Sequence, residues 1–265
     1  MSGIDSLLLT VLRRDRLALG ASLVAVVALA WGWLLLGAGM DMTAVEMTRM
    51  SGMDGWLMQP ATWSVGYAVL MFSMWWVMMV AMMLPSAAPM LLLYAQLNRK
   101  GGVGRSPLGS TTVFAAGYLV SWGGFSVVAV ALQWSLETAR LMSPMLEVTN
   151  VWLGAAILVA AGVWQFTPLK SLCLHQCRSP LAFLVANWRD GRQGALRMGF
   201  LHGAYCLGCC WFLMTLLFFG GVMNLAWIIG LAVFVLLEKT LPLGHWLGRL
   251  VGAVLVAWGV ALLLP

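Results

Sequence analysis

The chain has 265 residues, of which 62% are hydrophobic and only 9% are charged. Soluble domains carry about 25% charged residues, so this composition excludes a water-soluble enzyme. A helix that crosses a bilayer needs about 20 mostly apolar residues, which leaves room for several spans but not for a large aqueous domain as well. We therefore attribute the net charge of +6 to basic residues gathered on one side of a membrane, and we expect no nucleic-acid partner.

The apolar segments predict an all-α fold, a polytopic membrane bundle of about seven transmembrane helices in a single domain, 1–265. The first segment is too long for the apolar core of a signal peptide, so we expect a retained helix with its N-terminus in the cytoplasm. Pro85 and Pro89 interrupt the second segment near its end, where we expect a kink or the end of regular helix. The predicted spans are 17–39, 63–94, 108–134, 151–166, 198–219, 222–237 and 241–264.

The distribution of basic residues fits this threading. It places thirteen of the 15 Lys and Arg residues on the cytoplasmic side and only Arg49 and Arg140 outside. Cytoplasmic loops carry an excess of Lys and Arg, so we expect a multi-pass protein of the cell inner membrane with its C-terminus outside. Glu238 and Lys239 close the sixth predicted span, where we expect a salt bridge or an interfacial anchor.

The fifth predicted span carries the densest group of candidate metal ligands. At about 100° per residue, His202, Cys206 and Cys209 share one stripe of a helix, with Cys210 at its margin. Thiolate and imidazole are transition-metal ligands, so the stripe predicts a metal site. A free cysteine also packs between helices as a small apolar residue, and this alternative stays open.

A second cysteine pair lies in the longest hydrophilic stretch of the chain. Thr167 suits an N-cap and Pro168 suits the first helical position, which predicts a short cytoplasmic helix over about 168–178. Cys173 and Cys177 are four residues apart and face the same way on that helix. This spacing is looser than the CxxC of zinc or redox motifs. Whether this pair and the cysteines of the fifth span form one site or two stays open.

Methionines form the third set of candidate ligands. Those of the second span make two helical stripes, one with Met71, Met74, Met78 and Met82 and one with Met79, Met83 and Met90. The predicted outside loop, where no core is expected, adds Met40, Met42, Met47, Met50, Met53 and Met58. Thioether and thiolate are both soft ligands that suit Cu(I), so methionine outside and cysteine inside fit an inward copper path. Adaptable packing and a segment lying on the membrane surface are the alternatives.

Several motifs in order resemble an uncharacterised bacterial and archaeal family described as predicted metal-binding integral membrane proteins. These motifs are Met78–Ser86, Thr167–Pro180, Trp188–Gly191, His202–Trp211, Gly221–Asn224 and the pair Glu238 and Lys239. The resemblance covers about residues 65–245 and implies a multi-helix inner-membrane fold with metal binding. It does not distinguish transport, storage and catalysis.

Our leading hypothesis is an inner-membrane protein that binds a soft transition metal for metal handling or transport, with Cu(I) as the first candidate and zinc as the second. The predicted metal site comprises Cys206, Cys209, His202, Cys210, Cys173, Cys177, Met78 and Met82. The expected partners are the lipid bilayer and the metal ion, and other membrane subunits or a metallochaperone are further candidates.

Three other functions stay open at this point. The cysteines could form a membrane thiol-disulfide redox protein, the metal could be the centre of an embedded metalloenzyme, or the chain could be an accessory subunit of a larger complex. The sequence has no HExxH, P-loop or GxSxG motif, so the familiar metalloprotease, nucleotide-driven and serine-hydrolase chemistries have no support. Whether the protein is an enzyme is left undecided.

Overall fold

A computed structural model describes residues 3–50, 62–100 and 107–264. Within these ranges the protein is built of helices and has no strand, which confirms the all-α prediction. The helices are α1 (Gly3–Leu35), α2 (Ala44–Met50), α3 (Val65–Lys100), α4 (Pro107–Thr138), α5 (Val151–Trp164), α6 (Pro168–Arg178), α7 (Pro180–Asn187), α8 (Gly191–Gly220), α9 (Leu225–Thr240) and α10 (Gly244–Ala261).

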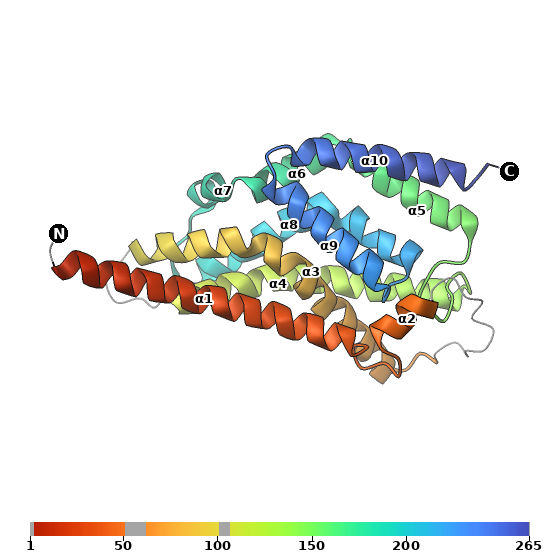
Figure 1. The fold of residues 1–265 in the computed structure, drawn as a ribbon, viewed down its shortest axis with the longest axis horizontal. Coiled ribbons are helices and arrows are strands. Elements are labelled where there is room, and N and C mark those ends of the chain that lie inside the picture. Colours follow the sequence, from red (N-terminus) through yellow and green to blue (C-terminus); the bar gives the residue numbers. More distant parts are fainter. Residues whose placement is uncertain (1–2, 51–61, 101–106, 265) are drawn as a thin grey trace.

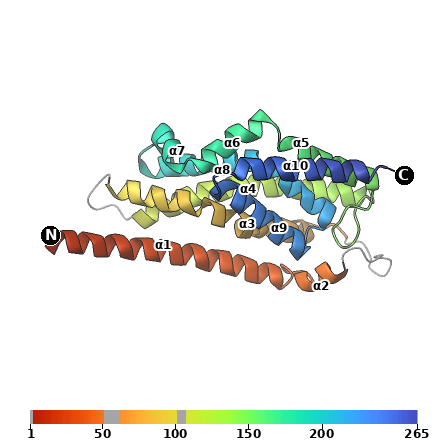
Figure 2. The same ribbon diagram turned by 45° about the horizontal axis from the view of Figure 1, so that its top comes forward.

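The long helices lie side by side along the long axis of the molecule, and the N- and C-termini lie at opposite ends of it (Figure 1). Successive members of the set α1, α3, α4, α5, α8, α9 and α10 run in alternating directions between the two ends (Figure 1). Helix α1 lies at one side of the bundle and packs on α3, whereas α8 is central and packs on α4, α5, α6 and α9 (Figure 2).

Five helical segments are long and apolar enough to cross a membrane. They are Leu17–Leu35, Val65–Asn98, Gly109–Thr138, Gly191–Gly220 and Gly244–Ala261. Helix α5 has 14 residues and is long enough to cross a membrane only together with α6, to which it is bent by 63°. Helix α9 has 16 residues. Five of the predicted spans thus correspond to these candidates, namely 17–39, 63–94, 108–134, 198–219 and 241–264. The count of seven spans stays a prediction.

Helix α3 does not end at its two prolines. It continues past Pro85 and Pro89 to Lys100, which removes one of the two outcomes that we expected there. The carbonyl oxygen of Met83, two residues before Pro85, accepts hydrogen bonds from Ser86 Oγ (2.8 Å) and Tyr118 Oη (3.2 Å). Proline is tolerated inside membrane helices that pack against neighbouring helices, as α3 packs against α4.

The hydrophilic stretch between the fourth and fifth predicted spans is mostly helical. Helix α6 has the predicted bounds, and its N-cap Thr167 accepts a hydrogen bond from Lys170 N (3.3 Å). Helix α7 was not predicted, because periodicity is hard to recognise in a helix of 8 residues. Helix α8 starts at Gly191 rather than at 198, because its charged first turns continue the helix beyond the apolar segment.

The methionines before the second span have a different environment from the one expected. Met47 of α2 is buried, and Met40 and Met42 pack partly buried against the same core. Helix α2 is fixed to the start of α9, where Leu225 N donates to Thr48 Oγ1 at 2.8 Å. The expectation that no core exists here is therefore wrong, since α2 folds back onto the bundle. Met53 and Met58 lie outside the described residues.

Glycines let α4 and α8 approach closely. A Cβ at Gly117 would overlap the backbone of Leu196 and Phe200, and a Cβ at Gly199 would overlap the backbone of Phe114. Small residues at such crossings are typical of membrane helix pairs. This contact holds the cysteine-bearing helix against α4.

We expect Gly199→Ala to destabilise the protein by about 1–3 kcal/mol, because the added methyl group would meet backbone that cannot rotate away. Gly230→Ala is the matched control, since a Cβ there would meet nothing within 4 Å. Thermal unfolding of both variants in detergent, followed by circular dichroism, provides the comparison. Equal melting temperatures for the two variants would show that the crossing is not tight.

Candidate metal centre

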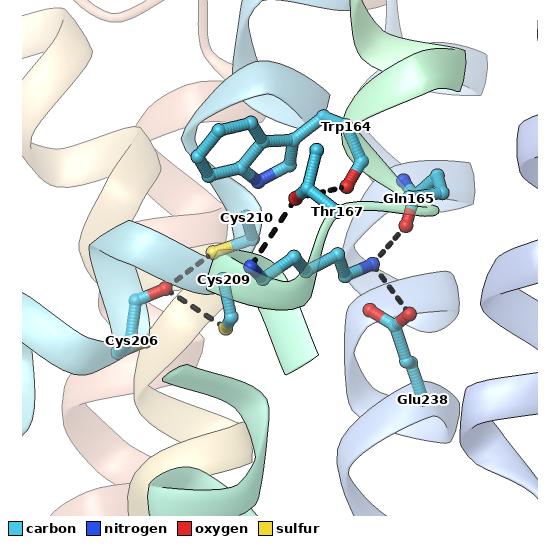
Figure 3. Close-up of polar contacts among 8 residues, drawn as sticks. Trp164, Gln165, Thr167, Cys206, Cys209, Cys210 and Glu238 are labelled. Atoms are coloured by element: carbon cyan, nitrogen blue, oxygen red, sulfur yellow. Dashed lines mark hydrogen bonds and ion pairs between the residues drawn. The ribbon is translucent and has the colours of Figure 1, made fainter. Parts of the chain in front are cut away.

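Three cysteines of α8 lie in the centre of the bundle. Cys206, Cys209 and Cys210 are each at most 1% exposed. The thiols of Cys209 and Cys210 both donate to the carbonyl oxygen of Cys206, at 3.0 and 2.9 Å (Figure 3). The predicted stripe thus faces the interior of the protein rather than lipid.

The short helix α6 packs against α8 and brings a fourth thiol to this group. Cys177 packs against the core that contains Cys206 and Cys209, and its thiol interacts electrostatically with their thiols. Cys173 lies at the margin, half-buried, with its sulfur against Gly208. The two cysteine pairs, 33 residues apart in the chain between Cys173 and Cys206, therefore face one another across a single helix contact. We call Cys177, Cys206, Cys209 and Cys210 the thiol cluster.

A buried lysine and a tyrosine contact the thiol cluster. Lys239 Nζ of α9 lies 2.9 Å from Cys206 Sγ and 3.1 Å from Ser86 Oγ of α3. Tyr118 Oη of α4 lies 3.0 Å from the same sulfur. The sequence analysis did not assign these residues to the site. An ionisable residue at the end of an apolar helix was the only available signal for Lys239, and nothing in the sequence distinguished Tyr118.

The residue before Lys239 forms the expected salt bridge. Glu238 Oε1 lies 2.5 Å from Lys170 Nζ, and both side chains are almost wholly buried. Lys170 also donates to Gln165 Oε1, so that α5, α6 and α9 are joined at one point (Figure 3). This network fixes α6, and with it Cys177, in place beside α8.

His202 is buried one turn before Cys206 on α8. Its ring stacks on Tyr118 with a centroid distance of 5.7 Å and contacts Phe183 at 5.3 Å and Phe114 at 6.3 Å. Its Nδ1 atom is buried without a hydrogen-bond partner. The structure thus places this predicted ligand next to the thiol cluster, within a cage of aromatic rings.

Methionines of α3 lie in the same buried core as the cysteines of α8. Met78 and Met82 are fully buried in the same core as the cysteines of α8. The Sδ atom of Met83 lies 4.0 Å from Cys210 Sγ. Met83 belongs to the second methionine stripe, which the predicted site did not include.

Among the residues that the structure describes, no three His, Cys, Asp or Glu side chains are grouped so that they could hold a metal ion together. A structural zinc site needs such a closed set of four ligands. Two thiolates in a line are a coordination that Cu(I) accepts, and soft sulfur ligands favour it. The sulfur atoms gathered around Cys206 are of the soft type that Cu(I) favours.

Comparison with known proteins gives one family. No curated protein and no solved structure matches the chain significantly. The model of the family PpoB2, described as copper chaperone, matches residues 72–262. The match includes all five cysteines, Lys239 and the described helices from most of α3 to α10. The chain therefore belongs to the PpoB2 copper chaperone family.

Proposed function

We propose that the protein lies in the cell inner membrane, binds Cu(I) between thiolates of the thiol cluster, and passes the ion on. The single observation that carries this proposal is that the half-buried Cys177 of α6 packs against the buried core of α8 that contains Cys206 and Cys209. Buried soft ligands suit Cu(I), and the copper chaperone family supports copper as the metal. We assign the primary ligands to these sulfurs and place His202 beside them.

We further propose that the chain crosses the membrane seven times with its N-terminus in the cytoplasm. The alternating directions of the helices support this topology (Figure 1), and so does the excess of Lys and Arg in the loops assigned to the cytoplasm. Helix α9 would span about 24 Å and needs a locally thin bilayer, whereas α5 and α6 would form one bent crossing. The thiol cluster would then lie near the middle of the bilayer.

The methionines of α3 supply a route from the outer side to this centre. Met71, Met78, Met82 and Met83 are all buried, and about 18 Å of helix separates the first from the last. Thioethers hold Cu(I) weakly and thiolates hold it tightly. An ion that enters at Met71 would therefore move towards stronger ligands and end beside Cys210.

We expect the double variant Met78→Leu/Met82→Leu to slow Cu(I) loading several-fold and to leave the final copper content unchanged. The reason is that leucine keeps the packing but removes two thioethers from the route. The rate is measured in proteoliposomes with Cu(I) added outside. Met198→Leu is the matched control, because Met198 is buried in a separate core cluster. Equal rates for the double variant and the control would exclude the route.

The proposed function is tested with protein purified without oxygen in detergent and titrated with Cu(I) against a chromogenic chelator. We expect about one tightly bound Cu(I) per chain, as a thiolate pair provides. Protein that leaves all Cu(I) on the chelator would contradict copper binding.

A thiol-disulfide redox protein is the second candidate, because Cys177 of α6 packs against the core that contains Cys206 and Cys209 of α8. It predicts a disulfide between α6 and α8 in trapped, oxidised protein. Mass spectrometry of alkylated peptides tests this, and cysteines that stay free under every condition would exclude it.

A further inference from the structure

Lys239 is a buried cation whose recorded hydrogen-bond partners are a sulfur and a hydroxyl. Its Nζ lies 2.9 Å from Cys206 Sγ and 3.1 Å from Ser86 Oγ, and the residue is 8% exposed. Lysine is almost never buried unless it is paired with a negative group. The contact with Cys206 therefore needs a functional explanation.

The neighbouring carboxylate does not provide the missing counter-charge. Glu238 forms its ion pair with Lys170 at 2.5 Å, and the charges of these two residues cancel. The closest group that can balance Lys239 is the thiol cluster, where cysteines become negative when they bind a metal.

The charge balance depends on the metal. Two thiolates with Cu(I) carry one net negative charge, and a lysine ammonium beside them makes the whole centre neutral. Two thiolates with Zn(II) are already neutral, so the ammonium would remain as an uncompensated charge in the core. A buried charge without a partner is costly, and this cost would weigh against the divalent ion.

We propose that Lys239 is the counter-cation of the metal dithiolate and makes the centre select soft monovalent ions over divalent ones. This inference rests on the proposed function and adds a determinant of metal selectivity. As each metal–sulfur bond forms, the thiol proton leaves to solvent and the thiolate donates the electron pair. No electron is transferred.

The test compares the binding of Ag(I) and Zn(II), together with Cu(I), by the wild type and by Lys239→Met in detergent. Ag(I) is a soft monovalent ion that is not oxidised by air. We expect Lys239→Met to lose about 100-fold in the ratio of Ag(I) to Zn(II) affinity, the effect of removing one partner of a buried charge pair. Lys239→Arg, which keeps the charge, should retain most of the wild-type ratio.

Two controls separate charge balance from loss of structure. Met198→Leu changes a buried residue of a separate core cluster, and we expect it to leave the affinity ratio unchanged. Lys239→Gln is a second neutral variant in case Lys239→Met does not fold.

Two results would overturn the inference. One is an unchanged affinity ratio in a folded neutral variant, and the other is wild-type protein that binds Zn(II) as tightly as Ag(I). Wild-type protein that binds neither Cu(I) nor Ag(I) would instead overturn the proposed function itself, and the inference with it.

Discussion

The double variant Cys206→Ser/Cys209→Ser should contain almost no copper, whereas the wild type should contain about one copper ion per chain. The substitution removes two buried sulfurs of α8 and leaves Cys177 without a thiol partner at those positions. Serine is nearly the same size as cysteine but is a hard oxygen ligand, so the centre loses its preference for Cu(I). The measurement is elemental analysis of protein purified without oxygen and loaded with Cu(I).

Cys173→Ser is the matched control for this experiment. Its sulfur lies half-buried at the margin, against Gly208, and not within the thiol cluster. We expect this variant to keep its copper. If Cys173→Ser loses as much copper as the double variant, Cys173 belongs to the primary ligands. If the double variant keeps its copper, the assignment of the site to α8 is wrong.

Lys170→Met should destabilise the protein by about 3–5 kcal/mol, because it leaves the carboxylate of Glu238 buried without its cation. Both side chains are almost wholly inside the protein, and the second oxygen of Glu238 already has no hydrogen-bond partner. The pair joins α6 to α9, so the variant should also release α6 from α8. Thermal unfolding in detergent measures the first effect, and faster alkylation of Cys177 reports the second.

Adding Glu238→Gln to Lys170→Met should restore most of the lost stability, since a neutral amide is far less costly to bury than an unpaired charge. Thermal unfolding of the double variant beside the single variant measures this rescue. Rescue is the result that distinguishes an electrostatic cause from a packing defect. A double variant as unstable as the single one would mean that the lysine stem, not its charge, holds α6.

The sequence was most informative where local rules decide the structure. Helix α6 begins and ends as predicted, because Thr167 caps it and Pro168 occupies its first position. The stripe of His202, Cys206 and Cys209 was found because helical periodicity relates residues that are near in sequence. The same periodicity found Met78 and Met82, which are buried in the core beside the cysteines.

The parts that could not be predicted depend on contacts between distant helices. Lys239 and Tyr118 reach Cys206 from α9 and α4, and no local pattern encodes those contacts. The same holds for Met83, whose Sδ lies 4.0 Å from Cys210 Sγ, although the predicted site included only Met78 and Met82 of the other methionine stripe. The burial of Met47 was missed because the return of α2 onto α9 is a tertiary contact.

The most direct test of Cu(I) binding by the thiol cluster is X-ray absorption spectroscopy at the copper edge on anaerobically loaded wild-type protein. We expect the edge of a Cu(I) ion of low coordination number and a nearest shell of sulfur alone, supplied by the thiols around Cys206. Scattering from an imidazole ring would place His202 among the ligands. A first shell dominated by nitrogen or oxygen would contradict the account.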